Sequence, residues 1–216
     1  MYADVHQPLG PRIQHAEYRR TREMSLEDLL LENRIIFLTG PIMERTSTNM
    51  IMRLLYLQSI KKDEGVSLYI NSQGGLIDQT LAIYDTLQFM TCEAATYCIG
   101  QAVSGAAVIL MAGAKGKRFI LPNAKVMLHQ PYGGITGHAE DVRIQAEEVL
   151  RDKQRLNEII AKHTGKSVQM IQEDTERDCY LSAEEAVEYG IVDEVLREDS
   201  KPDVKPAIRK RKKRKK

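Results

Sequence analysis

The chain has 216 residues, 43% of them hydrophobic and 28% charged, which is typical of one globular domain with a sizeable core. It contains no long apolar run and no apolar segment near its start, so the sequence predicts neither a membrane span nor a secretory signal, and we expect a cytoplasmic protein. The cysteines Cys92, Cys98 and Cys179 lack the paired spacing of metal ligands, which predicts reduced, structural thiols.

The net charge of +1 conceals a basic block at the C-terminal end. Residues 209–216 are all Lys or Arg, and without these eight, 23 of the 31 basic residues remain against 30 acidic ones. A block of like charges predicts a disordered tail on an acidic body. Such a tail could bind nucleic acid, an anionic membrane or an acidic partner, and it could equally be a solvated appendage without a partner. No aromatic residue interrupts the block, so nothing in it favours stacking on nucleic-acid bases.

The first quarter of the chain predicts an arm, a short helix and a strand. Residues 1–24 show no sustained hydrophobic period and predict a flexible arm. Ser25, followed three residues later by Asp28, predicts a capping box for a helix over residues 26–32. A strand over residues 34–39 and a helix over about 47–60 follow.

The middle of the chain alternates strands with helices. This alternation, with glycine turns between the elements, is typical of βαβ units and a parallel sheet, whose functional groups gather at the carboxyl ends of the strands. The strands are expected over residues 66–70, 94–99, 118–120 and 126–128, with helices over about 76–90 and from about 106.

Ser104 lies in the turn between the second of these strands and its helix, among Gly and Ala residues. A serine on a strand-to-helix turn faces open space, and the first free N–H groups of the helix point toward any negative charge that develops there. The pattern therefore favours a nucleophile, although a serine among small residues is also typical of close packing without catalysis.

The last third predicts a long polar helix and a small closing unit. The helix, over about residues 139–163, carries a narrow apolar stripe at Val142, Val149, Leu156 and Ile160. This stripe fits a helix that projects and packs on a neighbour, and it equally fits an amphipathic helix on its own sheet. Short helices over 167–176 and 182–189, the second with a capping box from Ser182 to Glu185, an extended segment at 177–181 and a closing strand over 190–195 complete the chain.

Ser104 has candidate partners further along the chain. His129 follows the predicted strand over 126–128, where its imidazole could take a proton from a hydroxyl near neutral pH, and Asp178 could orient the other ring nitrogen. Gly74 and Gly75 form a turn whose N–H groups could bind an oxyanion. The residue pattern alone does not select these residues, because the chain has five histidines and 30 acidic residues.

Several segments together resemble the Clp protease proteolytic subunit (ClpP) family, in order and with nearly gapless spacing over about residues 25–196. The matching segments are RIIFLTG (34–40), LYINSQGG (68–75), AIYDTLQF (82–89), IGQAVS (99–104), AGAKGKRF (112–119), MLHQP (127–131), EDTERD (173–178) and residues 181–194. The resemblance implies a crotonase-like α/β fold, a spiral of ββα-type units with a projecting handle over about 130–163. It places the peptidase domain at 25–196, between the arm and a disordered tail over 197–216.

The resemblance also implies the activity and its residues. The family is a serine endopeptidase that cleaves unfolded proteins and peptides inside a ring-shaped chamber, and its triad maps onto Ser104, His129 and Asp178. The oxyanion donors map onto the N–H groups of Gly75 and Gly105. No metal or organic cofactor is implied.

Assembly and partners follow from the same resemblance. The family forms two stacked seven-membered rings, with the handle and its glycine-rich strand in contact between rings, and Arg177 matches a position that links this contact to triad alignment. A Clp-type ATPase unfoldase is the implied partner. Its docking groove maps onto Leu55, Tyr69, Phe89, Phe119 and Leu196.

Three positions depart from the family pattern. Gly105 stands where the family commonly has Met, Gln73 where it commonly has Pro, and Ser67 where it commonly has an aromatic residue in the docking groove. Backbone donors survive the first two changes, but the missing Met side chain is expected to alter the substrate pocket. Two alternatives remain open: a non-catalytic or weakly active ring subunit that assembles with an active paralogue, and a crotonase-fold enzyme acting on acyl-coenzyme A.

Overall fold

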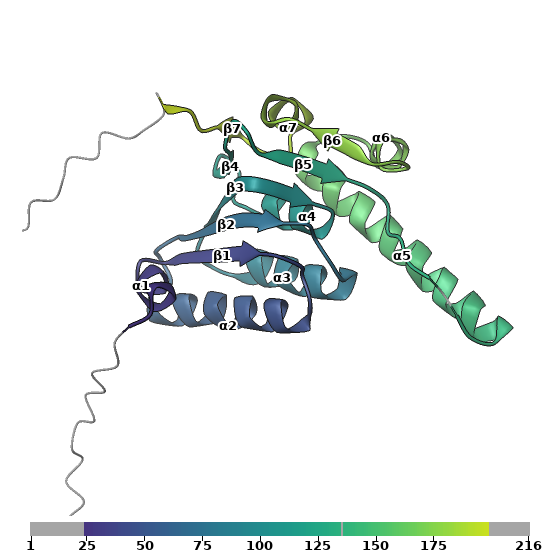
Figure 1. The fold of residues 1–216 in the computed structure, drawn as a ribbon, viewed down its shortest axis with the longest axis horizontal. Helices are drawn as coiled ribbons and strands as arrows, with labels where there is room; N and C mark the ends of the chain where they lie inside the picture. Colours follow the sequence, from purple (N-terminus) through teal and green to yellow (C-terminus); the bar gives the residue numbers. More distant parts are fainter. Residues whose placement is uncertain (1–23, 135, 199–216) are drawn as a thin grey trace, which may run out of the picture.

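Seven strands form one sheet in the computed structural model, which describes residues 24–134 and 136–198 (Figure 1). The predicted arm, up to residue 23, and the basic block lie outside the described residues, and the predictions made for them stay predictions. The strands are β1 (Ile35–Thr39), β2 (Val66–Ser72), β3 (Ala94–Val103), β4 (Arg118–Ile120), β5 (Lys125–Leu128), β6 (Cys179–Leu181) and β7 (Glu194–Val195). The helices are α1 (Leu26–Glu32), α2 (Glu44–Ile60), α3 (Ile77–Phe89), α4 (Gly105–Met111), α5 (Ala139–Thr164), α6 (Val168–Asp174) and α7 (Ala183–Tyr189).

The sheet is parallel except at one pair of strands. Its order is β1-β2-β3-β4-β7, with β5 beside β3 and β6 antiparallel to β5. The predicted parallel arrangement is thus confirmed. β3 is longer than predicted, because its second half, from Gln101 to Val103, pairs with β5 while Thr96 to Cys98 pair with β4. Pairing with a distant strand extends β3 past Gly100, which the local pattern does not reveal.

Side chains alternate along the central strands between a buried face and a more open face. In β2, Leu68 and Ile70 are fully buried, whereas Tyr69 between them is half-buried on the other face. Helices α2 and α3 run along one face of the sheet (Figure 1), and they contribute Leu54 and Ile83 to the core that holds the buried strand residues. The open face therefore presents the side chains of the intervening strand positions.

Helix ends follow the predicted signals. The Ser25 hydroxyl accepts from Asp28 N at 3.1 Å, and the Asp28 carboxylate accepts from Ser25 N at 3.1 Å, so the capping box of α1 is formed. Ser182 caps α7 in the same way through Glu185. Helix α2 begins at Glu44, three residues earlier than predicted, because its first turn is polar and lacks the apolar repeat that marks the rest.

Helix α5 has 26 residues and projects from the body of the molecule (Figure 1). Only its last third is buried, through Asn157, Ile160 and Ala161. Val149, in the outer half, is 39% exposed. The structure therefore favours the projecting helix over an amphipathic helix lying along its own sheet.

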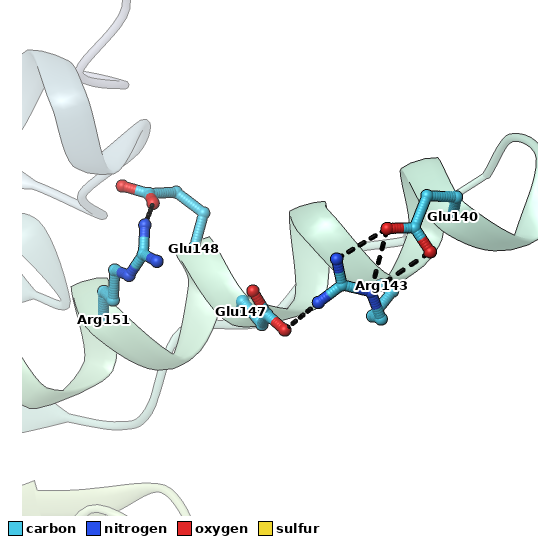
Figure 2. A network of polar contacts seen from close by, with 5 residues as sticks. All are labelled: Glu140, Arg143, Glu147, Glu148 and Arg151. Atoms are coloured by element: carbon cyan, nitrogen blue, oxygen red, sulfur yellow. Dashed lines mark hydrogen bonds and ion pairs between the residues drawn. The ribbon is translucent and has the colours of Figure 1, made fainter.

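Ion pairs between successive turns line the outer half of α5. Figure 2 shows Arg143 between Glu140 and Glu147, and Arg151 paired with Glu148. Such pairs at i,i+3 and i,i+4 support a helix that has few packed neighbours. Nowhere in residues 24–134 and 136–198 is a helix both long and apolar enough to cross a membrane.

Candidate active site

Ser104 occupies a strained backbone position between β3 and α4. Its φ of 57° and ψ of −125° are rare for a residue with a side chain. Ser104 N donates to Met127 O at 2.9 Å, which continues the pairing of β3 with β5. The side chain does not cap α4, so the hydroxyl is available for another partner. Strain of this kind persists where surrounding structure enforces it, and it is frequent at functional sites.

The glycine turn after β2 packs directly on Ser104. A Cβ atom at Gly74 would lie 2.6 Å from Val103 O and 2.8 Å from Ser104 Cβ, so only glycine allows this approach. A Cβ atom at Gly75 would lie 2.2 Å from Ile42 O. Ile42 N donates to Gly74 O, and Ile42 O accepts from Leu76 N, each at 2.9 Å. The turn is therefore fixed from both sides.

Gly75 and Gly105 both line the cavity that contains Ser104. Gly105 is the first residue of α4, so its N–H has no partner within the helix. Neither glycine N–H donates a hydrogen bond to another group within the described residues, 24–134 and 136–198. Two free donors beside one hydroxyl are what binding of an oxyanion requires.

His129 and Asp178 face each other across the ends of β5 and β6. The last pair of this antiparallel ladder is Leu128 with Cys179, and His129 and Asp178 are the next residues on the two strands. His129 Nδ1 lies 3.7 Å from Asp178 Oδ1, an ion-pair distance rather than a hydrogen bond. The His129 side chain is 13% exposed, whereas that of Asp178 is 60% exposed.

Backbone contacts hold the two strand ends together. Gln130 N donates to Thr175 O at 2.8 Å, and Gln130 Nε2 donates to Glu176 O at 3.0 Å. These bonds connect the residue after His129 to the segment just before Asp178. The facing positions are therefore set by the backbone, while the exposed Asp178 carboxylate retains rotational freedom.

One cavity of about 40 Å³ brings Ser104 and His129 together. Its wall comes from α3, α4, β5 and the inner end of α5, and is mostly apolar: Ile77, Val108, Leu128, Pro131, Leu156 and Ile160, with the polar residues Thr80 and Asn157. Sequence reasoning missed both polar residues. Thr80 and Asn157 are only 1% and 3% exposed. Asn157 follows Leu156 of the apolar stripe and lies three residues before Ile160, and a polar residue at helical spacing from the stripe is the signal that could have identified it.

The cysteines do not compete as nucleophiles. Cys98 is fully buried, and burial raises the pKa of its thiol to about 11. Burial, with a smaller effect of the carboxylates Asp174 and Glu185, also raises the pKa of Cys179. All three cysteines are free of disulfides, as the sequence predicts. Across the described part of the chain, no three His, Cys, Asp or Glu side chains gather where they could hold a metal ion.

Sequence comparison places this chain in a known family. The Clp protease family model matches residues 18–199. The chain belongs to the Clp protease family. ATP-dependent Clp protease proteolytic subunit 1 of Rhodopirellula baltica (strain DSM 10527 / NCIMB 13988 / SH1) is 54% identical over 182 residues, which cover 84% of this chain and 80% of that protein. The resemblance seen in the sequence and the fold class it implies are thus confirmed.

The open face of this Clp-family sheet carries a row of stacked aromatic rings. Phe37, Tyr69, Tyr97 and Phe119 stand on β1, β2, β3 and β4, at positions that are paired in register. Their ring centroids are 5.3, 4.6 and 5.1 Å apart in that order. Phe37 and Tyr97 did not emerge from the sequence, because parallel register alone places them beside Tyr69 and Phe119.

The other residues mapped from the Clp protease family are at the surface. Leu55 and Phe89, on α2 and α3, are 44% and 79% exposed. Leu196 is half-buried, and its N–H donates to Ile120 O, so it lies beside β4, next to Phe119. Arg177 is exposed and directly precedes Asp178. Arg177 therefore stands where a neighbouring subunit could reach it.

Proposed function

We propose that this chain is the proteolytic subunit of an ATP-dependent Clp protease and acts as a serine endopeptidase. The observation that carries the proposal is one cavity lined by both the strained Ser104 and His129, with Asp178 Oδ1 3.7 Å from His129 Nδ1. Membership of the Clp protease family and the name of its 54% identical relative support the same activity.

The chemistry is acyl transfer through a covalent intermediate. His129 takes the Ser104 hydroxyl proton as Oγ attacks the peptide carbonyl, and the resulting oxyanion accepts from the N–H groups of Gly75 and Gly105. The imidazolium then gives its proton to the leaving amine as the C–N bond breaks. Water attacks the acyl-enzyme carbonyl and loses a proton to His129, which passes this proton to Ser104 Oγ as the ester bond breaks and the carboxylic acid leaves. Asp178 keeps the histidine in the required tautomer. These steps require no cofactor.

Assembly is expected to complete the site. The distance between His129 and Asp178 is longer than a hydrogen bond, and Asp178 is largely exposed, so contacts from another subunit can shorten it. We place these contacts in two stacked seven-membered rings that meet through α5 and residues 130–137, with Arg177 linking the contact to Asp178. Enclosure in such a chamber would restrict cleavage to peptides and unfolded proteins.

The aromatic row suits the docking of a Clp-type ATPase. Tyr69 and Phe119 belong to the docking groove expected from the sequence, and the row adds Phe37 and Tyr97 to it. Rings that are stacked yet partly exposed offer apolar contact area to a partner. The cytoplasmic location and the partner of the basic block stay predictions.

Active-site labelling tests the proposal. A serine-directed fluorophosphonate should label the wild-type chain, and Ser104→Ala should abolish both labelling and peptide hydrolysis. Ser59→Ala is the matched control, because Ser59 is an exposed serine on α2, and its labelling should equal that of the wild type. If the assembled wild-type protein is neither labelled nor able to hydrolyse peptides, the proposed peptidase activity is refuted and the non-catalytic ring subunit is favoured.

A further inference from the structure

Thr80 fills the space beside Gly105 in the wall of the catalytic cavity. A Cβ atom at position 105 would lie 2.2 Å from Thr80 Oγ1, 3.0 Å from its Cγ2 and 3.1 Å from its Cβ. All three of the nearest atoms thus belong to one residue. Thr80 is only 1% exposed and lines the cavity together with Ser104 and Gly105.

Rotation of Thr80 cannot relieve this contact. Its hydroxyl donates to Leu76 O at 3.0 Å, one turn back along α3, which fixes the rotamer. Exchanging the places of Oγ1 and Cγ2 would bring the larger methyl group toward position 105, and Cβ itself would not move. Thr80 and a side chain at position 105 therefore exclude each other.

We infer that Thr80 determines which substrate side chain the pocket beside Ser104 accepts. The inference rests on the proposed function. When Ser104 Oγ attacks a carbonyl whose oxygen is held by Gly105 N–H, the side chain of the acylated residue must enter the space next to both residues. That space is the cavity of about 40 Å³ that Thr80 lines.

The wall that Thr80 provides favours small apolar side chains. Its hydroxyl proton is already committed to Leu76 O, so Thr80 adds bulk and no free donor. The cavity is narrow, with a volume of about 40 Å³, and the apolar side chains of Ile77, Val108 and Leu156 also line it. A short, β-branched and fixed residue limits how far the pocket can widen.

Substrate selectivity provides the first test. Two fluorogenic peptides that differ only in Ala or Leu before the cleaved bond would be compared by kcat/KM. Thr80→Ala removes Oγ1 and Cγ2 from the pocket wall and is expected to raise the Leu to Ala ratio about tenfold, the lower end of the discrimination that one methylene makes in an apolar pocket. Thr80→Val, which keeps the shape and loses the hydroxyl, should leave the ratio unchanged.

Thr86 offers a matched control on the same helix. Its hydroxyl donates to Ala82 O at 2.7 Å, the same local bond that Thr80 makes, and it is not part of the cavity wall. Thr86→Ala should leave the Leu to Ala ratio at the wild-type value. A ratio in Thr80→Ala within twofold of the wild type would overturn the inference.

A double-mutant cycle, measured by Tm, tests the steric conflict between Thr80 and a side chain at position 105 independently of catalysis. Gly105→Ala should lower the Tm strongly beside Thr80 and much less in a Thr80→Gly background, where all three close atoms are gone. An equal loss in both backgrounds would refute the Thr80 inference alone. Absence of fluorophosphonate labelling in the wild type would instead refute the proposed function, and the specificity role with it, so the two failures are distinguishable.

Discussion

Removing the charge of Asp193 is expected to destabilise the fold more than removing the charge of an exposed, ion-paired carboxylate. The Asp193 carboxylate accepts from Arg118 Nε at 3.0 Å, Nη2 at 2.6 Å and backbone N at 2.9 Å. Arg118 Nη1 also donates to His163 O and Gly190 O. One ion pair thus joins β4 to the C-terminal end of α5 and to the loop before β7.

The expected magnitude follows from burial. The side chains of Arg118 and Asp193 are 8% and 19% exposed. Asp193→Asn keeps the shape but leaves a buried guanidinium without a counter-charge, which typically costs about 3–5 kcal/mol. For a domain of this size, that corresponds to a Tm lowered by roughly 6–20 °C.

Thermal denaturation of the assembled protein, at one fixed concentration, measures this effect. Glu64→Gln is the matched control, because the Lys61–Glu64 pair lies away from α5 and is exposed, with side chains 58% and 50% accessible. Its Tm should change by no more than about 4 °C, since exposed pairs typically contribute about 0.2–1 kcal/mol. Equal Tm values for the two variants would contradict the argument.

Three further predictions concern the pH dependence of stability, the hydrogen bonds of Arg34 and backbone strain at Ser104. Burial raises the pKa of Asp193, but the hydrogen bonds from Arg118 lower it more, so the pKa lies below its usual value. The difference in Tm between the wild type and Asp193→Asn should therefore reach its maximum above about pH 4 and decrease as the pH falls further. Arg34 donates to the carbonyls of Leu57, Lys61, Glu64 and Gly65. Arg34→Ala should therefore lower the free energy of unfolding, measured with urea, by about 2–4 kcal/mol. A smaller decrease than that caused by Arg53→Ala would refute this role. Ser104→Gly should be about 0.5–2 kcal/mol more stable than Ser104→Ala, because glycine adopts the φ of 57° without backbone strain, at some entropic cost. If Ser104→Ala were the more stable variant, the turn would be unstrained.

What the sequence predicted well is local. The alternation of strands and helices and the capping boxes at Ser25 and Ser182 depend on residues a few positions apart, and the structure confirms them. The contact between Thr80 and Gly105 joins two elements 25 residues apart and has no local signature. The position of Tyr97 in the aromatic row depends on parallel register, which also leaves no local trace.

The proposed triad was identified through the family resemblance rather than from the residue pattern. His129 and Asp178 stand among many titratable residues, and their pairing depends on the antiparallel register of β5 with β6. Short strands of three or four residues carry too few alternating positions to reveal that register. The strain at Ser104 is likewise a property of the folded backbone, because serine itself has no preference for φ above zero.

The two halves of the site differ in rigidity, and this difference indicates where control can act. Ser104 and the glycine turn are fixed by backbone approaches that tolerate no added atom at Gly74, so the proposed nucleophile and its proposed oxyanion donors are preorganised within one chain. Asp178 is 60% exposed and lies 3.7 Å from His129. A partner that shifts Asp178 by about 1 Å changes a loose ion pair into a hydrogen bond that orients the base. Regulation by assembly should therefore alter the reactivity of Ser104 through the His129–Asp178 distance, without moving Ser104 itself.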